Sequence, residues 1–217
     1  MLSGKAENEL DAIYKKGENS FTTCHKLAGT IHFISMKPKT SMYSLQEKLI
    51  CFCVYYSAYE LYKEFLDIEF VAWGRTIRNA DNSLTCQFGV NDCWANRLHR
   101  CALSFLDGNL DAQMHYMRCE FATPFPAFLQ GSYTCANAVG LNLVDVDHCV
   151  NNPNDELDFQ AEIKGTELTL AINFIPSIVF NDVIDQTLHD QSLSRLVSMI
   201  CFALAEDPST GVTNCSL

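Results

Sequence analysis

The sequence predicts an α/β fold whose sheet is interrupted by a helical insertion stapled by disulfides. Two segments with strand character flank a short helical one in the first third of the chain, and a strand and a helix close the chain. Between these parts, apolar residues recur at helical spacing and six cysteines are spread along the segment. A strand, a helix and a strand in succession are typical of a parallel pair joined by a right-handed crossover.

The first predicted elements follow a polar stretch. Residues 1–43 show no regular pattern, and we expect an irregular N-terminal arm there. The run Leu49–Tyr56 is aromatic, β-branched and rich in cysteine, which predicts a buried strand. Ser57 can cap a short helix that ends near Phe65, and the alternation of polar and apolar residues in Asp67–Trp73 predicts a second strand.

The helical insertion is assigned to residues 86–170. Apolar residues repeat at helical spacing in its first part, between Trp94 and Phe121. Further helices are expected over residues 131–143 and 155–170.

The remainder of the chain returns to the sheet. Ile175–Phe180 predicts a strand, and apolar residues between Leu193 and Leu204 line one face of a last helix. The sheet domain is therefore assigned to residues 44–85 and 171–217.

Composition and charge exclude several classes of function. The 48% apolar and 19% charged content of the 217 residues is that of a globular protein. The net charge is −11, and the stretch Val144–Asp190 holds ten acidic residues against one lysine, which disfavours nucleic acid as a partner. The longest apolar run has eight residues, far fewer than the roughly 20 that span a bilayer, so we expect no membrane insertion.

Eleven cysteines spread singly through the chain argue for an oxidising compartment, because cytosolic thiols are kept reduced. Zinc ligands usually come in C-x2-4-C pairs, which are absent, so disulfides are expected and neither a metal nor another cofactor is. We expect a secreted protein whose signal peptide is missing from this chain, or a lysosomal one. An odd cysteine allows a monomer with a free thiol or a disulfide-linked dimer.

The segment Cys86–Cys101 reads CQFGVNDCWANRLHRC, with cysteines at intervals of seven and eight residues. It resembles the CQxGxxxC…N…C signature of the gamma-interferon-inducible lysosomal thiol reductase (GILT) family. The resemblance implies a thioredoxin-like fold with an inserted helical domain. The chain looks like a degenerate insect paralogue of this family, similar to a mosquito one.

The family carries its chemistry on a C-x-x-C pair, which this chain lacks throughout. In the family, twin tyrosines precede the pair, whose first cysteine starts a helix; there the helix N-terminus lowers the thiol pKa. Counting on from Tyr55 and Tyr56 places Glu60 and Lys63 at the two cysteine positions, and neither can form a disulfide. The resemblance therefore implies a pseudoenzyme that binds a protein partner, host or foreign.

A displaced redox pair is the alternative. Cys51 and Cys53 would share one face of the predicted strand, with Cα atoms about 6.5–7 Å apart, at the edge of disulfide geometry. A buried strand would also raise the thiol pKa and lower reactivity. A thiol-disulfide oxidoreductase that uses this pair, or the unpaired eleventh cysteine, remains the competing hypothesis.

The resemblance also suggests a binding groove. The family has a proline before its penultimate strand, facing the C-x-x-C pair, where an extended substrate can pair with the backbone. Ile175 and Pro176 occupy that place, and with Tyr55 and Tyr56 they form the candidate groove. Retention of Pro176 for the turn alone is the other interpretation.

Eight cysteines are expected to be structural. The family implies a bridge between Cys201 and Cys215, which closes a loop of about 15 residues and contributes about 3 kcal/mol in the chain-entropy model. The other six are expected to staple the insertion internally: Cys86, Cys93, Cys101, Cys119, Cys135 and Cys149. A glycosylation sequon at Asn214 overlaps the terminal cysteine.

Overall fold

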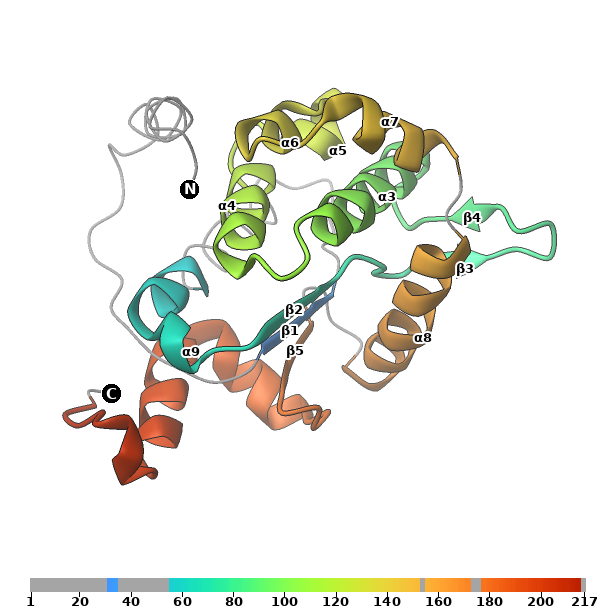
Figure 1. Ribbon diagram of the computed structural model, residues 1–217. Coiled ribbons are helices and arrows are strands. Elements are labelled where there is room, and N and C mark those ends of the chain that lie inside the picture. Colours follow the sequence, from blue (N-terminus) through green and yellow to red (C-terminus); the bar gives the residue numbers. More distant parts are fainter. Residues whose placement is uncertain (1–30, 35–54, 153–154, 173–176, 216–217) are drawn as a thin grey trace.

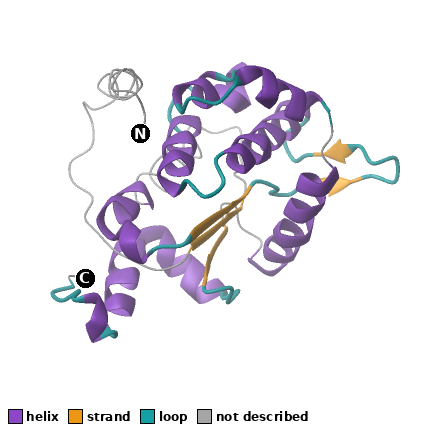
Figure 2. Cartoon of the chain, in the orientation of Figure 1, coloured by secondary structure: helices purple, strands orange, loops and turns teal. Residues whose placement is uncertain are grey.

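The computed structural model describes residues 31–34, 55–152, 155–172 and 177–215 (Figure 1). A three-stranded sheet lies at the middle of the described part, between helices (Figure 2). Its order is β2-β1-β5, where β1 is Ile31–Ile34, β2 is Ile68–Val71 and β5 is Ser177–Phe180. β1 pairs in parallel with β2 and antiparallel with β5, so the central strand is the earliest of the three in the chain.

The position of β1 corrects the predicted start of the sheet. β1 lies inside the stretch 1–43 that was expected to be irregular, and residues 55–62 are helical rather than the end of a strand. The rest of the predicted strand, residues 49–54, lies outside the described residues. Burial explains the helix: Tyr55, Ala58 and Tyr59 recur at helical spacing and are almost fully buried.

The expected strand–helix–strand unit is present with a different first strand. Residues 55–62 and the 3-10 helix η1 (Lys63–Phe65) lead directly into β2. Because β1 and β2 are parallel, the connection between them must cross over the sheet, and this helix belongs to the crossover.

Helices cover both faces of the sheet. Side chains of successive strand residues point to opposite faces, and the core accordingly divides in two. On one face Ile68 and Ile178 pack with residues of the 55–62 helix and of α9 (Gln186–Ala205). On the other face Val71 and Val179 join a cluster with Ala161, Leu168 and Ile172 of α8 (Asp155–Ile172).

The segment between β2 and α8 is helical after a short hairpin. The hairpin pairs β3 (Ile77–Arg78) with β4 (Leu84–Thr85). Five helices follow: α3 (Val90–Phe105), α4 (Leu110–Glu120), α5 (Pro126–Gln130), α6 (Thr134–Ala138) and α7 (Leu143–Asn151). The single helix expected over residues 131–143 is wrong, because α6 ends before Gly140, whose φ of 80° interrupts the helix.

Four disulfides hold this arrangement. Three lie within residues 86–149 and one joins α9 to the chain end: Cys86–Cys93, Cys101–Cys149, Cys119–Cys135 and Cys201–Cys215. The last pairing is the one that the family resemblance implies. Within the described residues, no helix is both long and apolar enough to cross a membrane.

Candidate functional site

The pairing of β1 with β5 defines one end of the sheet. Ile34, the last residue of β1, lies opposite Ser177, the first residue of β5. The chain therefore leaves β1 toward residues 35–54 at the same end where it arrives from residues 173–176. Ile175 and Pro176 themselves lie outside the described residues, so their part of the predicted groove remains a prediction.

His189, which no sequence motif singled out, supports this end of the sheet. Its ring is fully buried, and its Nδ1 accepts a hydrogen bond from the backbone N–H of Ile178 at 3.2 Å. Burial lowers the pKa of His189, so the ring is held neutral with its proton on Nε2. The ring thereby links α9 to β5 one residue after Ser177.

The twin tyrosines face protein rather than an open groove. Tyr55 is only 3% exposed and belongs to the core under the sheet. Tyr56 is half-buried, with the Arg118 guanidinium 4.1 Å from its ring centroid and the His115 ring 6.0 Å away on α4. Their assignment to a substrate-lining surface is therefore wrong for Tyr55, because a core side chain is not available to a partner.

Glu60 and Lys63 do not occupy a helix N-terminus. The helix is already formed at residue 55 and ends at residue 62, so Glu60 lies in its last turn and Lys63 follows it. Lys63 Nζ is 2.9 Å from Asp111 Oδ1, which also accepts a hydrogen bond from the Tyr59 hydroxyl at 2.7 Å. The Lys63 ammonium and this hydroxyl hold the pKa of Asp111 below its usual value. These residues dock the helix on α4.

Residues 35–54 connect β1 to the 55–62 helix. That stretch contains Cys51 and Cys53 and no C-x-x-C. Both cysteines lie outside the described residues.

The disulfide pairings limit which cysteines could carry redox chemistry. All eight cysteines of the described residues are in disulfides, which leaves Cys24, Cys51 and Cys53 of the eleven. The central strand of the described sheet is β1, and the predicted burial of Cys51 and Cys53 in a strand lies outside the described residues.

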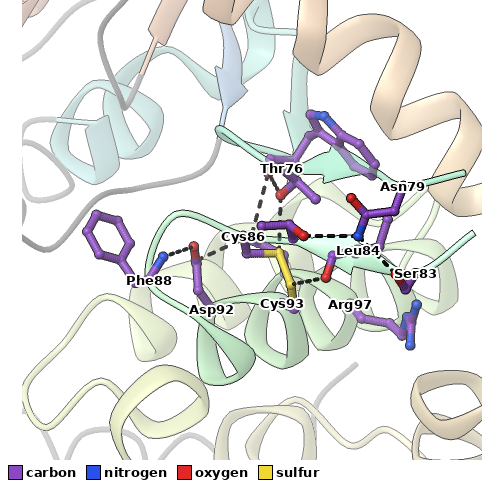
Figure 3. Close-up of a disulfide and its surroundings, with 12 residues drawn as sticks. Thr76, Asn79, Ser83, Leu84, Cys86, Phe88, Asp92, Cys93 and Arg97 are labelled. Carbon is purple, nitrogen blue, oxygen red and sulfur yellow. Dashed lines mark hydrogen bonds between the residues drawn. A yellow bond between two sulfur atoms is a disulfide. The ribbon is translucent and has the colours of Figure 1, made fainter.

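The disulfide within the signature, Cys86–Cys93, holds the start of α3 (Figure 3). Cys86 and Cys93 join the end of β4 to the first turn of α3, across Gly89 with its φ of 80°. Asp92 Oδ2 accepts the N–H of Phe88 at 3.2 Å, which fixes the turn before the helix. A residue with a Cβ rarely adopts this positive φ, which explains why the motif has glycine at this position.

The same signature ties α3 to the chain after β2. The Asn96 amide lies 3.5 Å from the carbonyl oxygen of Trp73, and the Thr76 hydroxyl donates to that oxygen. Thr76 Oγ1 is also 3.5 Å from Cys86 Sγ. The motif therefore positions the helical segment against the sheet.

These features agree with the comparisons to known proteins. The family model described as Gamma interferon inducible lysosomal thiol reductase (GILT) matches residues 36–139, which include the signature. Residues 36–139 of the chain therefore match a GILT-family domain. The match begins two residues after β1, so it also covers the stretch that holds Cys51 and Cys53.

Two insect proteins are similar to this chain, as the sequence had suggested. It is 21% identical over 191 residues to "GILT-like protein 1" of Drosophila melanogaster, covering 81% of this chain and 74% of the relative. It is 24% identical over 205 residues to the "Gamma-interferon-inducible lysosomal thiol reductase-like protein" of Anopheles gambiae, covering 86% and 81%.

Buried polar side chains lie close together within the helical segment, a feature that no sequence motif had indicated. His99 Nδ1 and the Tyr116 hydroxyl are 2.9 Å apart, and Glu120 Oε2 accepts the N–H of Ala127 at 2.9 Å. Burial lowers the pKa of His99 to about 3, with a further contribution from the Arg100 charge, and raises the pKa of Glu120 to about 8. Both groups are therefore neutral at pH 5 to 7.

Proposed function

We propose that this GILT-family protein lacks thiol reductase activity and acts by binding a protein partner. The observation that carries the proposal is the absence of a C-x-x-C pair from all 217 residues. Reduction of a disulfide by this family's chemistry needs one thiolate to attack and a second to resolve the mixed disulfide. The eight cysteines paired in the described residues offer no such thiols.

The scaffold proposed for this role is thioredoxin-like. Support comes from the sheet order β2-β1-β5 with one parallel and one antiparallel pair, and from helices on both faces. The inserted helices between β2 and α8 are the segment in which three of the four disulfides lie. Four disulfides favour an oxidising location, which we propose to be extracellular, with the lysosomal lumen as the alternative.

The decisive test is insulin-disulfide reduction with a dithiol donor, from pH 4.5 to 7.5, beside an active GILT-family enzyme. We expect no turnover above the donor blank at any pH. Turnover comparable to the active enzyme would overturn the proposal. Thiol titration of the native protein provides an internal control, because only Cys24, Cys51 and Cys53 are left to react.

A thiol-disulfide oxidoreductase that uses Cys51 and Cys53 is the second candidate. One observation favours it: these two cysteines lie in the chain between β1 and the 55–62 helix, and the family's first cysteine starts the helix that follows its strand. If insulin is reduced, Cys51→Ser and Cys53→Ser should each abolish turnover, and Cys24→Ser should leave it unchanged. Turnover that survives both substitutions would exclude the displaced pair.

A further inference from the structure

A cleft of about 510 Å³ runs beside β2. β2 contributes residues 67–72 along its whole length, and the walls come from α3 and α8, with one residue of α4. Figure 1 shows β2 passing between α3 and α8. Six extended residues span about 17 Å, so the cleft is elongated rather than round. Its size is in the range of ligand-binding pockets.

The cleft combines an apolar lining with charge. Phe70 of β2, Leu103 of α3 and Leu157 of α8 contribute apolar surface. Its two cationic side chains are already engaged: Arg100 pairs with the buried Asp158, and Lys164 pairs with Glu69. Both cations are therefore neutralised by the protein's own carboxylates, which disfavours an anionic ligand.

Two other carboxylates line the cleft and are exposed to solvent. Asp67 precedes β2 and Asp107 follows α3. Within the residues that the structure describes, neither carboxylate has a cationic partner. The chain as a whole carries a net charge of −11, which adds a long-range attraction for cations.

We propose that this cleft is the surface on which the protein, acting as the partner-binding molecule proposed above, docks an extended basic segment. The occupant has an extended backbone because the cleft follows β2. It carries lysine or arginine, which reaches Asp67 and Asp107, and apolar residues in alternate positions, which contact Phe70, Leu103 and Leu157.

The first test uses fluorescence anisotropy with a labelled seven-residue peptide of alternating valine and lysine. Its counterpart with glutamate in place of lysine is the chemical control. We expect saturable binding of the lysine peptide only, weakening as salt is raised from 50 to 200 mM. Absence of binding, or equal binding of both peptides, would overturn the proposed occupant.

Two double variants distinguish peptide binding at the cleft from attraction by the net negative charge of the protein. The double substitution Asp67→Asn with Asp107→Asn should weaken binding at least tenfold. A matched double substitution, Glu64→Gln with Asp145→Asn, changes the net charge equally at exposed positions that do not line the cleft. Equal loss in both double variants would show attraction by net charge alone and would refute the site.

A steric variant tests position without altering charge. Ser104 is exposed on α3 and lines the cleft, so Ser104→Trp should fill it and weaken binding at least tenfold while leaving the thermal unfolding midpoint nearly unchanged. Full binding by this variant would place the peptide elsewhere. The insulin assay is independent of these measurements: turnover there would overturn the non-catalytic function, whereas a failed peptide measurement would overturn only this site.

Discussion

Arg100 of α3 and Asp158 of α8 form an ion pair that is almost completely removed from solvent. Arg100 Nε donates to Asp158 Oδ1 at 2.9 Å, and the two side chains are only 5% and 4% exposed. Arg100 Nη1 also donates to the carbonyl oxygen of Ala72, at the end of β2, at 2.7 Å. One guanidinium therefore joins the helical segment, the helix that covers the sheet and the sheet itself.

Removal of one partner should be costly. Asp158→Asn leaves the Arg100 charge buried without its counter-ion, and loss of one member of a buried pair typically costs about 3–5 kcal/mol. Urea unfolding should show a loss of this size, whereas Asp145→Asn on the exposed face of α7 should change the free energy of unfolding by less than about 0.5 kcal/mol. Similar small effects for both variants would contradict a stabilising role for the pair.

For Gly165→Ala, helix propensity and core packing predict opposite changes in the free energy of unfolding. In an exposed helix, Gly→Ala stabilises by about 1 kcal/mol. In α8, however, a Cβ on Gly165 would overlap the Trp73 side chain, with Trp73 Cγ and Cδ1 at 2.7 Å. Trp73 is 1% exposed and cannot yield easily, so we expect Gly165→Ala to destabilise by about 1–3 kcal/mol in urea unfolding. Stabilisation would show that α8 shifts away from Trp73.

The sequence identified the elements whose pattern is long and periodic. α8 was expected over residues 155–170 and extends from Asp155 to Ile172. The last helix is longer than its apolar face, because polar residues from Gln186 onward extend it behind the Asp185 cap. These elements were predictable because one apolar face repeats over several turns.

The central strand was missed for a physical reason. β1 has only four residues and lies among polar ones, so its pattern was weak beside the eight-residue apolar run that follows it. Periodicity cannot distinguish such a run from a buried helix segment. The clusters around Asp158 and His99 had no local signal, because their partners lie far apart in the sequence.

Stability should depend on pH through His99 and Glu120. The pKa of His99 falls from 6.5 to about 3 on folding, so protonation of the unfolded state reduces stability as the pH falls through that interval. The pKa of Glu120 rises from 4.5 to about 8, so ionisation of the unfolded state reduces stability as the pH rises through that interval. The two slopes oppose each other between pH 4.5 and 6.5.

Free energies of unfolding measured from pH 3.5 to 8.5 should therefore show a plateau near pH 4.5 to 6.5. Beyond it, each group contributes a slope of at most about 1.4 kcal/mol per pH unit. Glu120→Gln, which stays neutral, should flatten the alkaline limb and extend the acid limb up to about pH 6.5, because the slope that opposed that of His99 is removed. An alkaline limb that is unchanged in this variant would assign the pH dependence to other groups.

The disulfides should differ in their contributions according to the loops they close. Cys101–Cys149 spans 48 residues and Cys201–Cys215 spans 14, for which the chain-entropy model gives about 4 and about 3 kcal/mol. Burial does not separate the two bridges, because Cys101 is 1% exposed and Cys201 3% exposed, so the loop length decides the order. Paired Cys→Ala variants of each bridge, unfolded in urea, should therefore show the larger loss for Cys101–Cys149. The reverse order would mean that the Cys201–Cys215 bridge stabilises more than its own loop.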